Sequence, residues 1–190
     1  KGKKISICEK VGSIAEKLAC DCVLVNWQQC GNVKSSISWE SLLKTADDFP
    51  DFYQMRFNDP VYILYSSGTT GKPKCIVHGI GGTLLQHLKE HRLHTDITRN
   101  DTLFYFTTCG WMMWNWLVSG LASGCTILLF DGNPFYPKYD ALMRIANEEG
   151  VSVFGTSAKY LSALDKENAK PNLQYDFKNL RTILSTGSPL

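Results

Sequence analysis

Short apolar segments alternate with amphipathic segments along most of the chain. The apolar segments predict short strands at residues 22–25, 61–65, 75–77, 103–106, 126–130, 151–154 and 181–184. Apolar positions spaced three and four residues apart predict helices at residues 11–18, 39–45, 83–94, 112–122, 142–146 and 158–164. Strands and helices that alternate in this way are typical of a layered α/β domain with a largely parallel sheet.

The pattern also predicts which surfaces are buried. Three strands, at 61–65, 103–106 and 126–130, are mostly apolar, so we expect them to be buried. The helix after residue 82 is expected to bury the side that carries Leu84, Leu85 and Leu88 and to expose Gln86, Lys89 and Glu90. Ser38 and Ser157 directly precede predicted helices and can cap them.

No charged residue lies between Asp101 and Asp131, and this stretch is long enough to cross a bilayer. Its apolar residues are interrupted, however, at Thr107, Gly110 and Gly120. A membrane-spanning helix is more uniformly apolar. The stretch is therefore predicted to form two strands and a helix of a protein core, without a membrane span.

Composition narrows the class of protein. The 190 residues are 44% hydrophobic and 20% charged, so the chain can bury a core. The net charge of +2 argues against nucleic acid or an anionic membrane surface as the main partner. The seven cysteines are odd in number and lack a CxxC pair, and no signal segment opens the chain. These features predict reduced thiols in a cytoplasmic protein.

The segment with the most distinctive chemistry follows the predicted strand at 61–65. It reads Ser-Ser-Gly-Thr-Thr-Gly-Lys-Pro-Lys over residues 66–74. Glycines let backbone N–H groups approach an anion, while hydroxyls and lysines add donors and positive charge. The common phosphate loop has four residues between its glycines and leads into a helix, whereas here two residues separate the glycines and a strand follows. The segment thus predicts either a different nucleotide loop or a plain polar hairpin loop.

Residues 65–74, together with residues 59–64 and His78, resemble the signature phosphate loop of the acyl-adenylate-forming enzymes. Within that family, residues 81–91 and 110–116 are similar to the acyl-CoA synthetases that act on acetoacetate. The resemblance implies the layered α/β N-terminal domain of the adenylate-forming fold. Residues 1–190 are expected to be an incomplete part of that domain, without the C-terminal domain.

The resemblance also implies a reaction and its substrates. Family members activate a carboxylic acid with ATP and Mg²⁺, release pyrophosphate, and pass the acyl group to coenzyme A. Here the acid would be acetoacetate. The catalytic lysine is expected downstream, so the 190 residues are expected to contain no catalytic residue, to provide no metal site, and to be inactive alone. An acetyl- or propionyl-CoA synthetase and a non-catalytic nucleotide-binding module remain alternatives.

Site residues follow from the matching positions. The ATP phosphates would be bound by Ser66, Ser67, Gly68, Thr69, Thr70, Gly71, Lys72 and Lys74. The acyl pocket and coenzyme A gate would be formed by Trp111, Met112, Met113 and Thr186, although a Met/Trp-rich helix is also typical of a core. Adenine would bind at Gly187, Ser188 and Pro189. Related short-chain synthetases have Glu at the position of Ser188.

One of these positions suggests how the acid is selected. Thr186 occupies a place that is Val in acetyl-specific relatives, and its hydroxyl could bind the 3-oxo group of acetoacetate.

Three histidines offer a rival interpretation. His87, His91 and His94 lie on one face of a predicted helix and could bind a metal. Without the zincin pattern or further ligands, a solvated helix face is the preferred interpretation. A Gly-x-Ser-x-Gly nucleophile motif is also lacking around Ser67.

Overall fold

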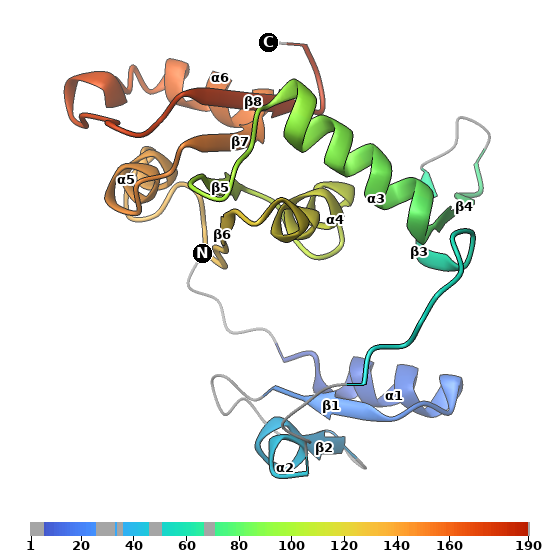
Figure 1. Ribbon diagram of the computed structural model, residues 1–190. Coiled ribbons are helices and arrows are strands. Elements are labelled where there is room, and N and C mark those ends of the chain that lie inside the picture. The colour runs from blue at the N-terminus through green and yellow to red at the C-terminus, as the bar shows by residue number, and fades with distance from the viewer. Residues whose placement is uncertain (1–5, 26–32, 34–35, 46–50, 67–70, 190) are drawn as a thin grey trace. The chain divides into compact units, whose positions relative to one another are not determined.

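The computed structural model describes residues 6–25, 33, 36–45, 51–66 and 71–189. The chain forms two compact units, residues 1–54 and residues 55–190 (Figure 1). The second unit contains the predicted nucleotide loop and all the other predicted site residues.

The described residues of the first unit form two helices and two short strands. They are α1 (Cys8–Leu18), β1 (Cys22–Leu24), β2 (Ser36–Ser38) and α2 (Trp39–Leu43), and the two strands pair in parallel. Ser38 caps α2 as predicted, because its Oγ accepts a hydrogen bond from the Ser41 N–H at 3.1 Å. The strand β2 was not predicted, because its Ser-Ile-Ser sequence is mostly polar.

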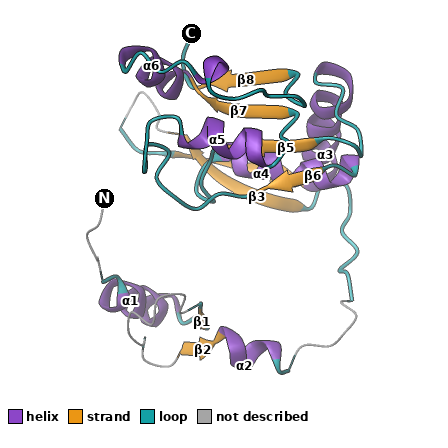
Figure 2. Cartoon of the chain, turned by 90° about the vertical axis from the view of Figure 1, so that its left-hand side faces the viewer, coloured by secondary structure: helices purple, strands orange, loops and turns teal. Residues whose placement is uncertain are grey.

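The second unit is built on a four-stranded parallel sheet (Figure 2). The strands are β5 (Thr102–Tyr105), β6 (Thr126–Leu128), β7 (Val153–Ser157) and β8 (Thr182–Thr186), in the order β6-β5-β7-β8. The predicted parallel α/β sheet is therefore confirmed. Because β6 follows β5 in the chain but lies on its far side, β5 and β7 become the central neighbours.

Helices connect the strands and cover both faces of the sheet. The connections are α4 (Met112–Ser119) with a 3₁₀ turn (Gly120–Ser123), α5 (Ala141–Glu148), and α6 (Ala158–Lys166) with a 3₁₀ turn (Pro171–Leu173). Alternate residues of the strands enter two hydrophobic cores. Phe104 and Phe154 pack with residues of α5 and α6, whereas Leu103 and Val153 pack with residues of α4.

The uncharged stretch between Asp101 and Asp131 folds as predicted into strand, helix and strand. Among the described residues, no helix is long and apolar enough to cross a membrane. The predicted burial of 126–130 is wrong. Strand β6 ends at Leu128 and lies at the edge of the sheet, so Thr126 and Leu129 are exposed.

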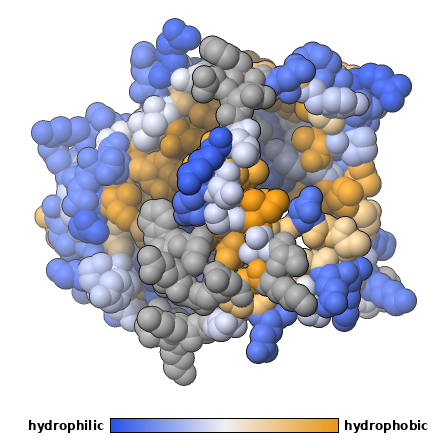
Figure 3. All heavy atoms as spheres, turned by 90° about the horizontal axis from the view of Figure 1, so that it is seen from below, coloured by the Kyte–Doolittle hydropathy of each residue, from blue (hydrophilic) through white to orange (hydrophobic). Residues whose placement is uncertain are grey.

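The nucleotide-loop strands form a separate antiparallel hairpin, β3 (Pro60–Ser66) and β4 (Lys74–Gly79). Among the described strands, β3 pairs only with β4 and does not enter the parallel sheet. Its predicted burial is therefore also wrong: Ile63 is 57% exposed and Tyr65 is 71% exposed. Such hydrophobic side chains reach the surface in several areas between hydrophilic ones (Figure 3). The hairpin leads directly into α3 (Ile80–Lys89), which continues as a π-helical turn (Glu90–His94).

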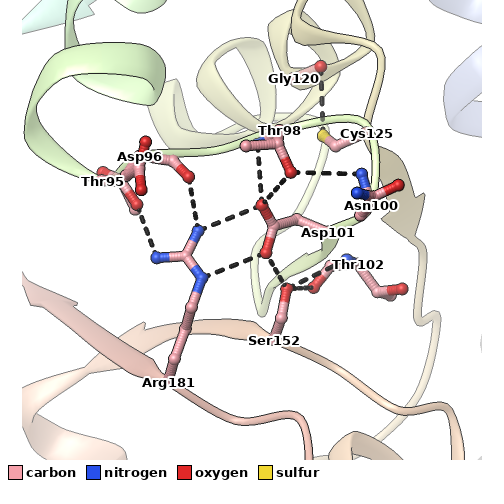
Figure 4. A network of polar contacts seen from close by, with 10 residues as sticks. All are labelled: Thr95, Asp96, Thr98, Asn100, Asp101, Thr102, Gly120, Cys125, Ser152 and Arg181. Atoms are coloured by element: carbon pink, nitrogen blue, oxygen red, sulfur yellow. Dashed lines mark hydrogen bonds and ion pairs between the residues drawn. The ribbon is translucent and has the colours of Figure 1, made fainter.

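A partly buried ion pair joins the amino-terminal ends of three sheet strands (Figure 4). Arg181 precedes β8, and its Nε and an Nη atom donate to the two carboxylate oxygens of Asp101, which precedes β5, at 3.2 and 3.1 Å. Ser152, just before β7, donates to the same carboxylate at 2.7 Å. The guanidinium also donates to the carbonyls of Thr95 and Asp96. This network therefore sets the starting points of three strands relative to one another.

We expect the Asp101→Asn substitution to lower the free energy of unfolding by about 2 kcal/mol, because it weakens the charge-assisted hydrogen bonds between Asp101 and the partly exposed Arg181. Urea unfolding measures the loss. The matched control is Glu148→Gln, which removes the exposed ion pair between Glu148 and Arg144 and is expected to cost about 0.5 kcal/mol or less.

The same pair predicts a pH dependence. Burial by itself would raise the pKa of Asp101, but hydrogen bonds from Arg181, Ser152 and Thr98 outweigh it and hold the pKa well below its usual value of 3.8. The stabilisation is therefore complete above pH 3.8 and is lost as the pH falls toward the lower, folded-state value. A stability difference between the wild type and Asp101→Asn that did not narrow below pH 3.8 would contradict this account.

Candidate functional site

The connections that follow the central strands β5 and β7 lead to opposite edges of the sheet. The chain leaves β5 toward β6 at one edge and leaves β7 toward β8 at the other. In open parallel sheets, ligands bind in the crevice at the carboxyl ends of two such strands. A pocket of about 330 Å³ opens at this position. Its lining residues are Tyr105, Phe106, Thr107, Thr108, Trp111, Met112, Met113, Thr156, Ser157, Thr186 and Gly187.

The pocket brings together all four residues that the sequence predicted for the acyl pocket. Trp111, Met112 and Met113 lie at the start of α4, and Thr186 is the last residue of β8. Thr186 reaches this position because β8 pairs with β7, with Thr186 opposite Ser157. Residues far apart in the sequence therefore meet at one edge of the sheet.

Helix α4 is buried near its C-terminal end and exposed at its N-terminal end. Trp116 and Leu117 are buried in the core that packs against β5 and β7. Trp111, by contrast, is 62% exposed, and Met112 is also exposed. The two interpretations of the Met/Trp-rich segment thus apply to different parts of it: its first residues line the pocket, and its later residues form core.

Tyr105 shapes the floor of the pocket and was not predicted as a site residue. Its hydroxyl donates to the Thr156 carbonyl at 3.0 Å, and its ring lies against Gly155, where a Cβ atom would clash with it. Burial raises the pKa of Tyr105 to about 12, so the hydroxyl keeps its proton at neutral pH. The sequence placed Tyr105 within the predicted strand at 103–106 and Ser157 at the predicted cap of a helix, and neither position indicated a role in the site.

The predicted phosphate loop joins the two strands of the hairpin. Ser66 at the end of β3 pairs with Lys74 at the start of β4, while Ser67, Gly68, Thr69 and Thr70 lie outside the described residues. Gly71 has a φ of 103°, a left-handed conformation that favours glycine. Lys72 and Lys74 are exposed. A strand follows the loop, as predicted, so it differs from the common phosphate loop that leads into a helix.

A second cavity, of about 580 Å³, connects the hairpin with the start of α4. It is lined by residues 61–65 of β3, by residues 109–112 and by Asn115. Met112 lines this cavity as well as the first pocket. The start of α4 therefore lies between the strand that enters the phosphate loop and the pocket at the sheet edge.

The predicted adenine-binding residues follow β8. Gly187 has a φ of 101°, so the chain turns there in a conformation that favours glycine, and this residue lines the pocket. Ser188 and Pro189 are exposed and are not part of the pocket lining. Their role in binding adenine stays a prediction.

The preferred interpretation of the histidines is wrong for two of them, and the predicted burial of this helix is wrong at two leucines. His87 and His91 are buried, with His91 at 0% exposure, whereas Leu84 and Leu85 are exposed. The histidine side of α3 packs against α4. The Nδ1 atom of His87 lies 2.9 Å from the Ser119 hydroxyl oxygen. Hydrophobic spacing alone did not indicate that the partner of α3 would be a helix with polar atoms at the contact.

Trp116 lies at the centre of this helix contact. Its ring packs edge-on against the His91 ring at 4.2 Å, and its Nε1–H donates to a Glu90 carboxylate oxygen at 2.8 Å. His94, at the end of the π-helical turn, is exposed. Among the described residues, which include all the histidines, no group of three or more His, Cys, Asp or Glu side chains could hold a metal ion. The metal interpretation of this helix is therefore not supported.

Burial and the neighbouring His87 lower the pKa of His91 from 6.5 to about 4, although Glu90 acts in the opposite direction. Neither ring nitrogen of His91 has a hydrogen-bond partner among the described residues. The imidazole is therefore neutral at neutral pH and acts as a packing group between α3 and α4.

Comparisons with known proteins were consistent with one another. A model of the family described as AMP-binding enzyme matches residues 8–190. The chain is 47% identical over 195 residues to acetoacetyl-coenzyme A synthetase of Rhizobium meliloti (strain 1021), covering 100% of this chain and 30% of that protein. It is 49% identical over 154 residues to malonamoyl-CoA synthetase of Penicillium aethiopicum, covering 74% of this chain and 21% of that protein.

A solved structure gives the same result. The structure of acetoacetyl-CoA synthetase from Streptomyces lividans matches with a TM-score of 0.88 and 40% sequence identity. The match covers 99% of this chain and 29% of that one. The chain thus spans less than a third of the length of these relatives.

The neutral, buried state of His91 predicts a stability change in acid. Because the folded-state pKa lies below the unfolded value of 6.5, the free energy of unfolding should fall as the pH drops from 6.5 toward 4. We expect the His91→Phe substitution, which keeps a ring beside Trp116, to remove up to about 3 kcal/mol of this loss in urea unfolding. The exposed His94→Phe is the matched control. Equal pH profiles for the wild type and His91→Phe would refute the assignment.

Proposed function

The chain belongs to the AMP-binding enzyme family, and from this premise we propose that it is part of an ATP-dependent acid–CoA ligase that acts on acetoacetate. The complete protein joins acetoacetate to the AMP portion of ATP and releases pyrophosphate. It then passes the acyl group to the thiol of coenzyme A and releases AMP. The observation that carries this proposal is the meeting of Trp111, Met112, Met113 and Thr186 in one pocket, beside the hairpin of the phosphate loop.

The phosphate loop offsets the negative charge of the reactants when the acyl-adenylate forms. An anionic carboxylate attacks an anionic phosphate, so positive charge and fixed geometry lower the barrier. We assign Lys72 and Lys74, which are exposed at the end of the hairpin, to the phosphate oxygens of ATP. The loop residues Ser66–Gly71 supply hydroxyl and backbone donors to the same oxygens. Mg²⁺ bound to these oxygens would supply further positive charge.

The pocket at the sheet edge suits a small acid. Its Trp and Met side chains offer apolar contacts and exclude water from the reacting carboxylate. Thr186 adds a hydroxyl that can donate to the 3-oxo group. The exposed side chains of Trp111 and Met112 stand at the mouth of the pocket, where we assign them to the approach of coenzyme A. The lysine that contacts the reacting carboxylate is assigned to a C-terminal domain beyond these 190 residues.

We also propose that the protein works in the cytosol. Five described cysteines are free thiols, namely Cys20, Cys22, Cys75, Cys109 and Cys125. Reduced thiols are usual in that compartment.

A second candidate substrate is malonamate, favoured by the 49% identity to malonamoyl-CoA synthetase. Malonamate has an amide where acetoacetate has a methyl ketone, so both acids carry a carbonyl oxygen at the third carbon. The pocket hydroxyl of Thr186 would serve either acid in the same way. The two differ in the extra hydrogen-bond donors of the amide, which the apolar Trp and Met side chains would leave unpaired.

We expect ATP–pyrophosphate exchange by the complete protein to depend on acetoacetate and to be much weaker with acetate, propionate or malonamate. The exchange measures formation of the acyl-adenylate without the second step. Exchange stimulated by acetate but not by acetoacetate would refute the substrate assignment. No exchange with any acid, from a protein that still binds ATP, would favour a non-catalytic nucleotide-binding module.

The Thr186→Val substitution tests the acyl pocket. Val has nearly the same shape as Thr but lacks the hydroxyl, so we expect the preference for acetoacetate over butyrate in kcat/KM to fall about 10-fold. The activity with butyrate serves as the internal control and should change little. An unchanged preference would mean that Thr186 does not bind the 3-oxo group.

A further inference from the structure

Thr186 has a hydroxyl neighbour in the pocket. Ser157 is the last residue of β7, and it is the register partner of Thr186 on β8. Register partners on parallel strands point to the same face of the sheet. Both residues line the pocket that also contains Trp111, Met112 and Met113. The sheet therefore presents two hydroxyl side chains, one from each strand end, to the same space.

The Ser157 hydroxyl is held in place by helix α6. Its Oγ accepts a hydrogen bond from the Tyr160 N–H at 3.2 Å and so caps the helix. A serine hydroxyl that accepts one bond in this way can still donate its own proton. No described residue accepts that proton, and the Thr186 hydroxyl likewise makes no hydrogen bond to a described residue. Ser157 is thus a donor with a fixed position and no internal acceptor.

A third strand-end hydroxyl of the pocket, that of Tyr105, already has an acceptor. Tyr105 donates to the Thr156 carbonyl at the floor of the pocket, and its pKa is raised, so it keeps that proton. Thr156 itself lies on the opposite face of β7 from Ser157, because side chains alternate along a strand. Among the strand-end residues, Ser157 and Thr186 are therefore the two with donors directed to the pocket face.

We propose that Ser157 is a second specificity-determining residue, which acts with Thr186 to bind the 3-oxo group of the acid; this inference rests on the proposed function. A ketone oxygen has two lone pairs, and two hydroxyls on neighbouring strands can donate one hydrogen bond to each. An acid without the 3-oxo group would cover these two exposed hydroxyls without accepting a hydrogen bond from either. A site built around such donors selects strongly against that acid.

The test measures kcat/KM for acetoacetate and for butyrate with the complete protein. We expect Ser157→Ala to lower the acetoacetate-to-butyrate ratio about 10-fold, because one hydrogen bond to the 3-oxo group is lost. Ser157→Gly removes the same hydroxyl but is tolerated well at a helix cap, and it should lower the ratio equally. Ser157→Thr keeps both the hydroxyl and the cap, and should retain the wild-type preference.

A matched control separates the hydroxyl from the helix cap. Ser38 caps α2 in the first unit by the same kind of hydrogen bond and lies outside the pocket lining. Ser38→Ala should leave the ratio unchanged. If Ser157→Ala and Ser157→Gly lower the activity with both acids equally, Ser157 serves only the cap, and the inference is overturned. A change confined to the KM for coenzyme A overturns it as well.

The outcomes also separate this inference from the proposed function. A wild-type protein that prefers acetoacetate, with the same preference in Ser157→Ala, overturns only the role of Ser157. A wild-type protein with no acetoacetate-dependent activity overturns the proposed function, and the role of Ser157 with it.

Discussion

The ion pair between Asp101 and Arg181 controls the alignment on which the pocket depends. It joins the residue before β5 to the residue before β8, and Ser152, before β7, donates to the same carboxylate. The pocket lies at the other end of these strands. Because side chains alternate along a strand, a shift of one residue in the pairing of β8 would turn Thr186 to the opposite face. A contact at the amino-terminal edge of the sheet thus determines which side chains face the pocket at the carboxyl-terminal edge.

The two ends of the sheet have different roles, one in stability and the other in binding. The amino-terminal edge contains a charged network in which every carboxylate oxygen of Asp101 has a donor. The carboxyl-terminal edge presents the hydroxyls of Ser157 and Thr186, which are exposed and donate to no described residue. Helix α4 follows the same rule, since Trp116 is held in the core by Glu90 and His91 while Trp111 is open at the pocket. Rigid elements therefore position groups that are free to meet a ligand.

Much of the fold was predictable because it depends on local sequence. The central strands, the helices after them, and the cap at Ser157 all follow from apolar spacing and polar residues near their ends. The errors share one cause. The strand at 61–65, the edge strand after Gly124 and the outer side of α3 were misjudged because apolar spacing does not say which element packs against a segment. His91 is buried because its partner is α4, a fact absent from its own surroundings in the sequence.

The sequence by itself determined most of the elements, the composition of the phosphate loop and the residue types of the acyl pocket. These depend on residues that are close together in the chain, so short motifs carry them. The tertiary structure alone decided that Ser157 stands beside Thr186 and that Tyr105 forms the floor below them. That arrangement depends on the order β6-β5-β7-β8, in which the chain passes over β5 before it adds β7 and β8. Strand order comes from packing between distant segments, and no local pattern records it.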